Sequence, residues 1–125
     1  FTSLAHDSVQ ILEWSINQVM DIPSLQQTLV MNAHTGLGLD KMRIQPQLQV
    51  GFRQGGERIC PAGRQGHHSL KKLFQEAEVP PWLRDRIPLI YQDGELIAVA
   101  GYWVADEYKV AADEAGLFPE LIAMK

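Results

Sequence analysis

The sequence predicts an α+β domain: an antiparallel sheet or partial barrel with two short helices packed on it. Several short segments alternate apolar with polar residues, as half-buried strands do. An Asp-Gly pair separates two apolar runs, which is typical of a tight hairpin. Helical spacing of apolar residues is clearest in one short stretch near residues 70–78. The 125 residues, 46% of them hydrophobic, suffice for one domain with a real core.

The N-terminal third predicts two short strands. Residues 1–13 fit a helix or a strand equally well. Beyond them apolar residues alternate loosely until Pro23 breaks the pattern, so we expect strands near 16–22 and 26–32.

The clearest alternation lies between residues 42 and 53. Every even position is apolar or proline: Met42, Ile44, Pro46, Leu48, Val50 and Phe52. Because side chains alternate across a strand, we expect one face in the core and the other lined with cations and amides. Pro46 either divides the segment into two strands or marks a sheet edge. The glycine-rich residues 54–68 predict a loop, with a short strand near 57–60.

Two short helices are predicted next. Ser69 is a suitable N-cap for a helix over 70–78, and Pro80-Pro81 can open a second over 81–86. The side chains expected in the core here are Leu70, Leu73, Phe74 and Trp82.

A hairpin follows the helices. Asp93-Gly94 suits a type I′ turn, so strands are expected near 88–92 and 95–104. The acidic tail after Asp106 has weak helical character as far as Ala123.

The net charge of −4 hides a strong asymmetry. Residues 1–40 hold four acids and no Lys or Arg, and residues 87–125 hold seven acids against two lysines. Residues 41–86 hold nine cations against four acids, a net charge of +5. An anionic partner should therefore be sought in the middle segment.

A lone cysteine, Cys60, cannot form an intramolecular disulfide, which favours a reducing compartment and hence the cytoplasm. The longest run of apolar residues and glycine, residues 96–105, is too short to cross a bilayer, and no signal peptide is visible, so no membrane partner is expected.

The sequence shows no phosphate-cradling motif of the G-x-x-x-x-G-K-[ST] type. Cys60, His67 and His68 are too few for a structural zinc site, and their spacing matches no common zinc motif. A thiol nucleophile with a histidine base is equally weakly indicated, since such a cysteine is more often a small buried hydrophobe. We therefore expect neither a catalytic residue nor a metal site.

The basic residues carry the stronger signal. Five cations fall within twenty residues, in or beside the glycine-rich loop: Arg53, Arg58, Arg64, Lys71 and Lys72. Glycines allow the backbone to approach a phosphate closely, and the helix start after the loop adds unpaired N–H groups. The alternative is that these are ordinary solvated surface charges.

Two long runs resemble a known family. They are SLKKLFQEAEVPPWLRDRIPLIY, residues 69–91, and LIAVAGYWV, residues 96–104. With the preceding Gly-Glu-Arg58 and Pro-Ala-Gly-Arg64, they closely resemble the C-terminal domain of bacterial tRNA(Ile)-lysidine synthetase. The strong match covers about residues 48–108. We expect residues 1–47 to be a strand-rich N-terminal part, the connection from a preceding domain, and residues 48–125 to be the C-terminal tRNA-binding domain.

The resemblance implies part of a cytoplasmic ATP-dependent ligase. That family adenylates the wobble cytidine of a CAU anticodon, and lysine then displaces AMP to give lysidine. Its N-terminal catalytic domain carries a Ser-Gly-Gly-x-Asp-Ser phosphate loop, absent here, so ATP and magnesium belong to that domain and this chain alone is non-catalytic. The implied partners are tRNA(Ile), held chiefly at the acceptor stem, and the N-terminal catalytic domain of the same protein.

Carried over by position, the residues expected to bind RNA are Arg58, Arg64, Lys71, Lys72, Arg84 and Arg86. Arg53 joins them through its strand parity. His67 and His68 stand where relatives often carry Arg or Lys, so contact there is either weaker or pH-dependent. The alternative function is a structural or dimerisation module whose basic face docks on acidic protein surface, including a possible homodimer.

Overall fold

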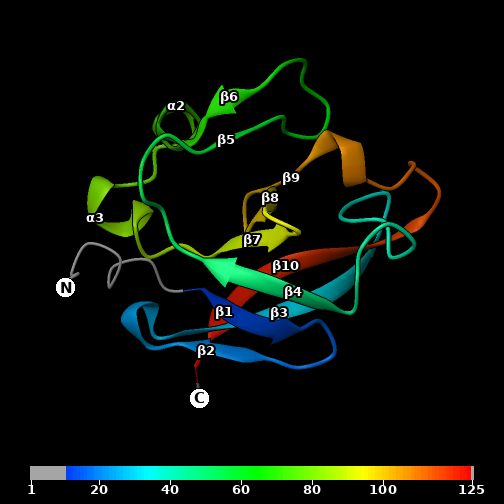
Figure 1. The fold of residues 1–125 in the computed structure, drawn as a ribbon, viewed down its shortest axis with the longest axis horizontal. Coiled ribbons are helices and arrows are strands. Elements are labelled where there is room, and N and C mark those ends of the chain that lie inside the picture. The colour runs from blue at the N-terminus through cyan, green and yellow to red at the C-terminus, as the bar shows by residue number, and fades with distance from the viewer. Residues whose placement is uncertain (1–10, 125) are drawn as a thin grey trace.

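Sheet A, of five antiparallel strands, runs through the middle of the molecule in the order β1-β4-β7-β8-β9 (Figure 1). The computed structural model describes residues 11–124. The strands of sheet A are β1 (Leu12–Ser15), β4 (Gln47–Gly51), β7 (Leu89–Gln92), β8 (Glu95–Val99) and β9 (Trp103–Val104). The ambiguous prediction for residues 1–13 falls mostly outside the described residues.

Sheet B has the order β10-β3-β2, and a separate small hairpin pairs β5 with β6. Their bounds are β2 (Met20–Ile22), β3 (Gln27–Thr35), β5 (Arg58–Ile59), β6 (His68–Ser69) and β10 (Ala115–Ala123). The helices are α2 (Leu70–Glu76), α3 (Pro81–Arg84) and the 3₁₀ turns η1 (Pro23–Leu25) and η2 (Asp106–Tyr108). The predicted fold class, mostly antiparallel sheet with short helices, is confirmed.

Two hydrophobic cores hold these layers together. The first joins sheet A to sheet B and contains Trp14, Leu48, Ile90, Leu29 and Phe118, among others. The second joins the opposite face of β7 and β8, through Leu89 and Val99, to residues of β5 and α2 such as Ile59, Leu73 and Phe74. The central strands are therefore covered on both faces, and the helices and the small hairpin form one outer layer.

Several local predictions are confirmed. Ser69 caps α2, because its Oγ accepts a hydrogen bond from the Lys72 amide at 3.2 Å. Asp93 and Gly94 both have positive φ, 51° and 82°, as a type I′ turn requires. These features depend on residues close together in the chain.

Four predictions were wrong. The strand predicted over 42–53 is confined to β4; the chain turns before it, and Met42 is 90% exposed. Of the strand predicted over 16–22 only β2 forms, because the chain first makes a turn in which the Gln18 amide donates to the Ser15 carbonyl at 2.9 Å. Trp82, expected in the core, is 70% exposed.

The fourth error concerns the acidic tail, where the predicted helix is replaced by η2 and the nine-residue strand β10. All nine residues of β10 lie opposite β3, and Gly116 and Pro119 within it disfavour a helix.

Candidate nucleic-acid interface

Six of the predicted binding residues gather on the outer layer formed by the β5–β6 hairpin and the start of α2. We call this set the α2 surface: Arg58, Arg64, His67, His68, Lys71 and Lys72. The hairpin register pairs Arg58 with Ser69, so the arginine lies beside the helix start. Ile59, Leu70 and Leu73 turn inward to the second core, leaving the polar side chains of the same segments at the surface.

Three members of the α2 surface converge on Glu76. The Arg64 guanidinium contacts the Glu76 carboxylate at 2.8 Å, with both side chains about two-fifths exposed. That hydrogen bond is the main reason the pKa of Glu76 lies below its usual value, and the charges of Lys72 and His68 act in the same direction. One ionised acid thus stands among a larger number of basic groups, and the cluster keeps an excess of positive charge.

Hydrogen bonds to the backbone of the hairpin loop hold Arg58 and His68. Arg58 Nη2 donates to the His67 carbonyl at 2.9 Å, which ties the guanidinium across the hairpin. His68 Nε2 lies 3.1 Å from the Gln65 carbonyl. Gly63 and Gly66 adopt positive φ, 86° and 76°, with no atom near a Cβ built there, so the loop turns through conformations that other residues adopt poorly.

An acidic rim bounds the α2 surface on one side. Beside Arg58 and His67 lies a cavity of about 250 Å³ that is also lined by Glu95, Asp106 and Glu107. The Gly63 amide donates to Asp106 at 3.1 Å, and this bond, reinforced by Lys109, lowers the pKa of the Asp106 carboxyl. These carboxylates make the far side of the cavity unfavourable for a phosphate.

Three predicted residues lie apart from the α2 surface. Arg53 pairs with Asp85 at 3.0 Å, and its side chain is only 22% exposed. Arg84 Nε donates to the Val79 carbonyl at 2.9 Å, which fastens α3 to the end of α2. Arg86 is exposed and lines a cleft that also contains Asp21 and Asp85. Arg53 and Arg84 therefore have structural partners. Arg53 and Arg86 also lie near acidic side chains, and Arg84 is half-buried.

Cys60 and the histidines of its loop are not arranged around a common point. Cys60 is half-buried, and its Sγ donates to the Arg64 carbonyl at 3.4 Å. Within residues 11–124 no group of three or more His, Cys, Asp or Glu side chains is placed to hold a metal ion. In the same residues, no helix is long and apolar enough to cross a membrane.

Sequence reasoning missed two features of this region. Glu76 was not singled out, although its spacing of four residues from Lys72 is the usual signal of a helix-surface charge pair. A groove of about 370 Å³ beside β4 and β7, lined by Phe52 and Tyr91, was not foreseen at all. No short-range pattern marks it, because it is formed by residues from different strands.

The fold and the α2 surface together define an antiparallel β domain that presents a basic hairpin and helix, a class suited to an anionic partner. The sequence profile of the family described as the TilS substrate C-terminal domain matches residues 48–121. The chain belongs to this family, as its sequence predicted.

Two individual relatives support the same family assignment. The chain is 38% identical over 112 residues to a tRNA(Ile)-lysidine synthase of Coxiella burnetii, a match that covers 90% of this chain and 25% of the relative. It is 47% identical over 83 residues to the tRNA(Ile)-lysidine synthase of Methylococcus capsulatus, covering 66% of this chain and 19% of the relative. The chain therefore spans about a quarter or less of the length of these relatives.

A solved structure described as a TilS C-terminal domain superposes with a TM-score of 0.68 at 19% identity, covering 93% of this chain and 99% of that one. At 19% sequence identity, this superposition shows only that the two chains share a fold.

Proposed function

We propose that this domain binds tRNA for a tRNA(Ile)-lysidine synthase, with residues 48–125 supplying the contacts. The observation that carries the proposal is the convergence of Arg64, His68 and Lys72 on one surface of a chain that belongs to this family. The α2 surface would contact backbone phosphates of tRNA(Ile), chiefly in the acceptor stem, while the catalytic domain modifies the anticodon.

The chemistry of the surface suits a duplex RNA backbone. A-form RNA offers its phosphates and 2′-hydroxyls rather than readable base edges in the major groove, so a shape-and-charge contact is the expected mode. Lys71 and Lys72 are exposed, and the loop glycines allow close approach of a strand. We assign ATP, magnesium and lysidine formation to the catalytic domain of the longer cytoplasmic enzyme, since the present sequence has no phosphate-cradling motif.

The direct test is the salt dependence of tRNA binding, measured by fluorescence anisotropy with Lys71→Glu/Lys72→Glu. If each lysine contacts one phosphate, the log–log salt slope should fall by roughly 0.7–0.9 per lysine, and affinity near 0.1 M salt by about 25- to 60-fold. Acidic residues suit the first turn of a helix, so a loss of binding would not reflect an unfolded α2. Lys41→Glu is the matched control, because Lys41 is exposed and lies in a different loop, between β3 and β4.

Equal affinities for the wild type and the double variant would refute the proposed surface. The alternative, a module that docks on acidic protein surface or forms a homodimer, predicts a different result. Size-exclusion light scattering would then show self-association without RNA that rises with concentration and disappears in the same double variant.

A further inference from the structure

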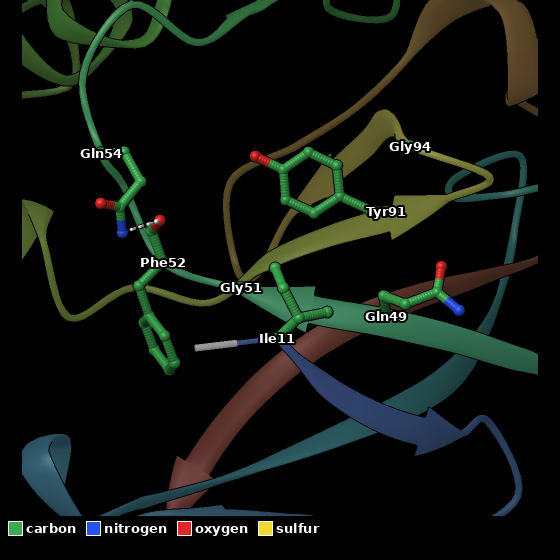
Figure 2. A pocket seen from close by; sticks show the side chains of 7 residues that line it. All are labelled: Ile11, Gln49, Gly51, Phe52, Gln54, Tyr91 and Gly94. Atoms are coloured by element: carbon green, nitrogen blue, oxygen red, sulfur yellow. Dashed lines mark hydrogen bonds between the residues drawn. The ribbon is translucent and has the colours of Figure 1, made fainter. Parts of the chain in front are cut away.

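An apolar groove lies on the face of sheet A that carries the helices, but beyond the part the helices cover. Its walls are Ile11, Gln49, Phe52, Gln54 and Tyr91, together with the backbone of two glycines, and its volume is about 370 Å³ (Figure 2). Gln49 points to this side because Leu48 and Val50, its neighbours in β4, are buried in the first core. Strand β1 is the edge of sheet A, so the groove opens at the end of the sheet.

The groove combines aromatic rings with uncharged polar groups. Tyr91 projects from β7 with its hydroxyl turned toward the loop that carries Gln54 (Figure 2). No group in residues 11–124 forms a hydrogen bond with that hydroxyl. Burial raises the pKa of Tyr91, and the nearby Glu57 carboxylate adds to the shift, so the hydroxyl remains a proton donor at neutral pH.

This chemistry selects against a phosphate and in favour of a planar, uncharged ring. None of the described residues that line it is a cation, and the Glu57 charge near Tyr91 would repel an anion. A nucleobase has apolar faces that can stack on an aromatic ring such as that of Tyr91, and polar edges that suit amide groups, as in single-strand recognition by other RNA-binding domains. The volume falls within the range of small-molecule sites and is ample for one base with its ribose.

The groove is also continuous in the chain with the α2 surface. Gln54 at its rim is followed by a turn in which Glu57 accepts hydrogen bonds from the Gln54 and Gly55 amides at 2.6 and 3.0 Å. Arg58 comes next. The same short, fixed loop therefore joins the apolar groove to the cationic surface.

We propose that the groove receives one unpaired nucleobase of the RNA whose backbone lies on the α2 surface. This inference rests on the proposed tRNA-binding function and adds a single-stranded element to it. The ring of Tyr91 supplies the stacking surface for the base.

The test compares two RNA hairpins of the same stem, one blunt and one with a four-nucleotide 3′ overhang, by fluorescence anisotropy. The wild-type chain should bind the overhang RNA about 5- to 150-fold more tightly than the blunt one, the range expected for stacking one base on an aromatic ring. Tyr91→Leu should abolish this preference and leave blunt binding unchanged, whereas Tyr91→Phe should keep most of it. Tyr102→Leu, a half-exposed tyrosine in the β8–β9 turn, is the matched control.

A second variant tests the groove independently, in case Tyr91→Leu misfolds. Ile11 is 53% exposed at the lip of the groove, so Ile11→Glu should preserve the fold and weaken only the overhang RNA. A 2-aminopurine in the overhang should lose fluorescence on binding, and lose less with Tyr91→Leu.

The outcomes separate the two proposals. If neither RNA binds, the proposed function fails. If both RNAs bind equally and only the Lys71→Glu/Lys72→Glu variant weakens them, the function stands and the base-binding groove is refuted. Concentration-dependent dimers that Ile11→Glu dissociates would show that a second copy covers the groove, which would also overturn the inference.

Discussion

Removing the charge of Glu76 should strengthen RNA binding. Glu76 holds Arg64 at 2.8 Å and is the acid on which Lys72 and His68 also act. In Glu76→Gln, Arg64 is released to make one more phosphate contact. The salt slope should then steepen by roughly 0.7–0.9, which corresponds to about sixfold tighter binding near 0.1 M salt. The pair lies at the surface with both side chains about two-fifths exposed, so little stability should be lost.

The assay is anisotropy with tRNA across a salt series at neutral pH, where Glu76 is ionised because Arg64 keeps its pKa low. Glu78→Gln is the matched control: it makes the same change two residues further on, at an exposed side chain. Adding Arg64→Ala to Glu76→Gln should remove the gain. Unchanged or weaker binding by Glu76→Gln would refute the idea that this acid competes with phosphate for Arg64.

Three stability predictions follow from the fold. Phe74→Ala should lower the free energy of unfolding in urea by about 3–5 kcal/mol, because Phe74 is fully buried. Trp82→Ala should lower it by less than about 0.5 kcal/mol, because Trp82 is exposed. Similar losses for the two variants would contradict the assigned core. Gly94→Ala should lower the free energy of unfolding by about 1 kcal/mol. The whole effect should come from the positive φ, because an alanine Cβ at this position would meet open space. An unchanged urea midpoint would argue against the type I′ turn.

Glu120→Gln should lower the melting temperature more at pH 7 than at pH 3. Asn32 and then His34 hold the pKa of the folded Glu120 below its ordinary value of 4.5, so its stabilisation is present above that pH and lost as the pH falls. A pH-independent difference would exclude this origin.

The parts of the fold that were predictable depend on neighbours in the chain. The cap at Ser69, the apolar spacing of α2 and the Asp93-Gly94 turn are all local, and the structure contains them. The pairing of β10 with β3 joins segments about eighty residues apart, and no pattern within either one specifies it. Trp82 was misassigned because its helix, four residues long, is too short to present a periodic face.

The same distinction applies to the cations. Charge counting located the basic segment, but it could not separate Arg53, which is paired with an acid 32 residues away, from Arg58 and Lys72. That separation depends on tertiary neighbours, and so does the groove.

The positions of the acidic side chains restrict the path that a bound RNA strand can take away from the α2 surface. Glu95, Asp106 and Glu107 border the α2 surface beside Arg58, so a phosphate backbone leaving the basic groups is repelled on that side. Toward Phe52 the connecting loop carries one acid, Glu57, against the three acids on the side of η2. An RNA strand lying on α2 is therefore favoured to continue along this loop rather than across η2, and that path ends at the groove beside Tyr91. Thus the acidic flanks that give the chain its net charge of −4 would also orient the proposed anionic ligand on its basic surface.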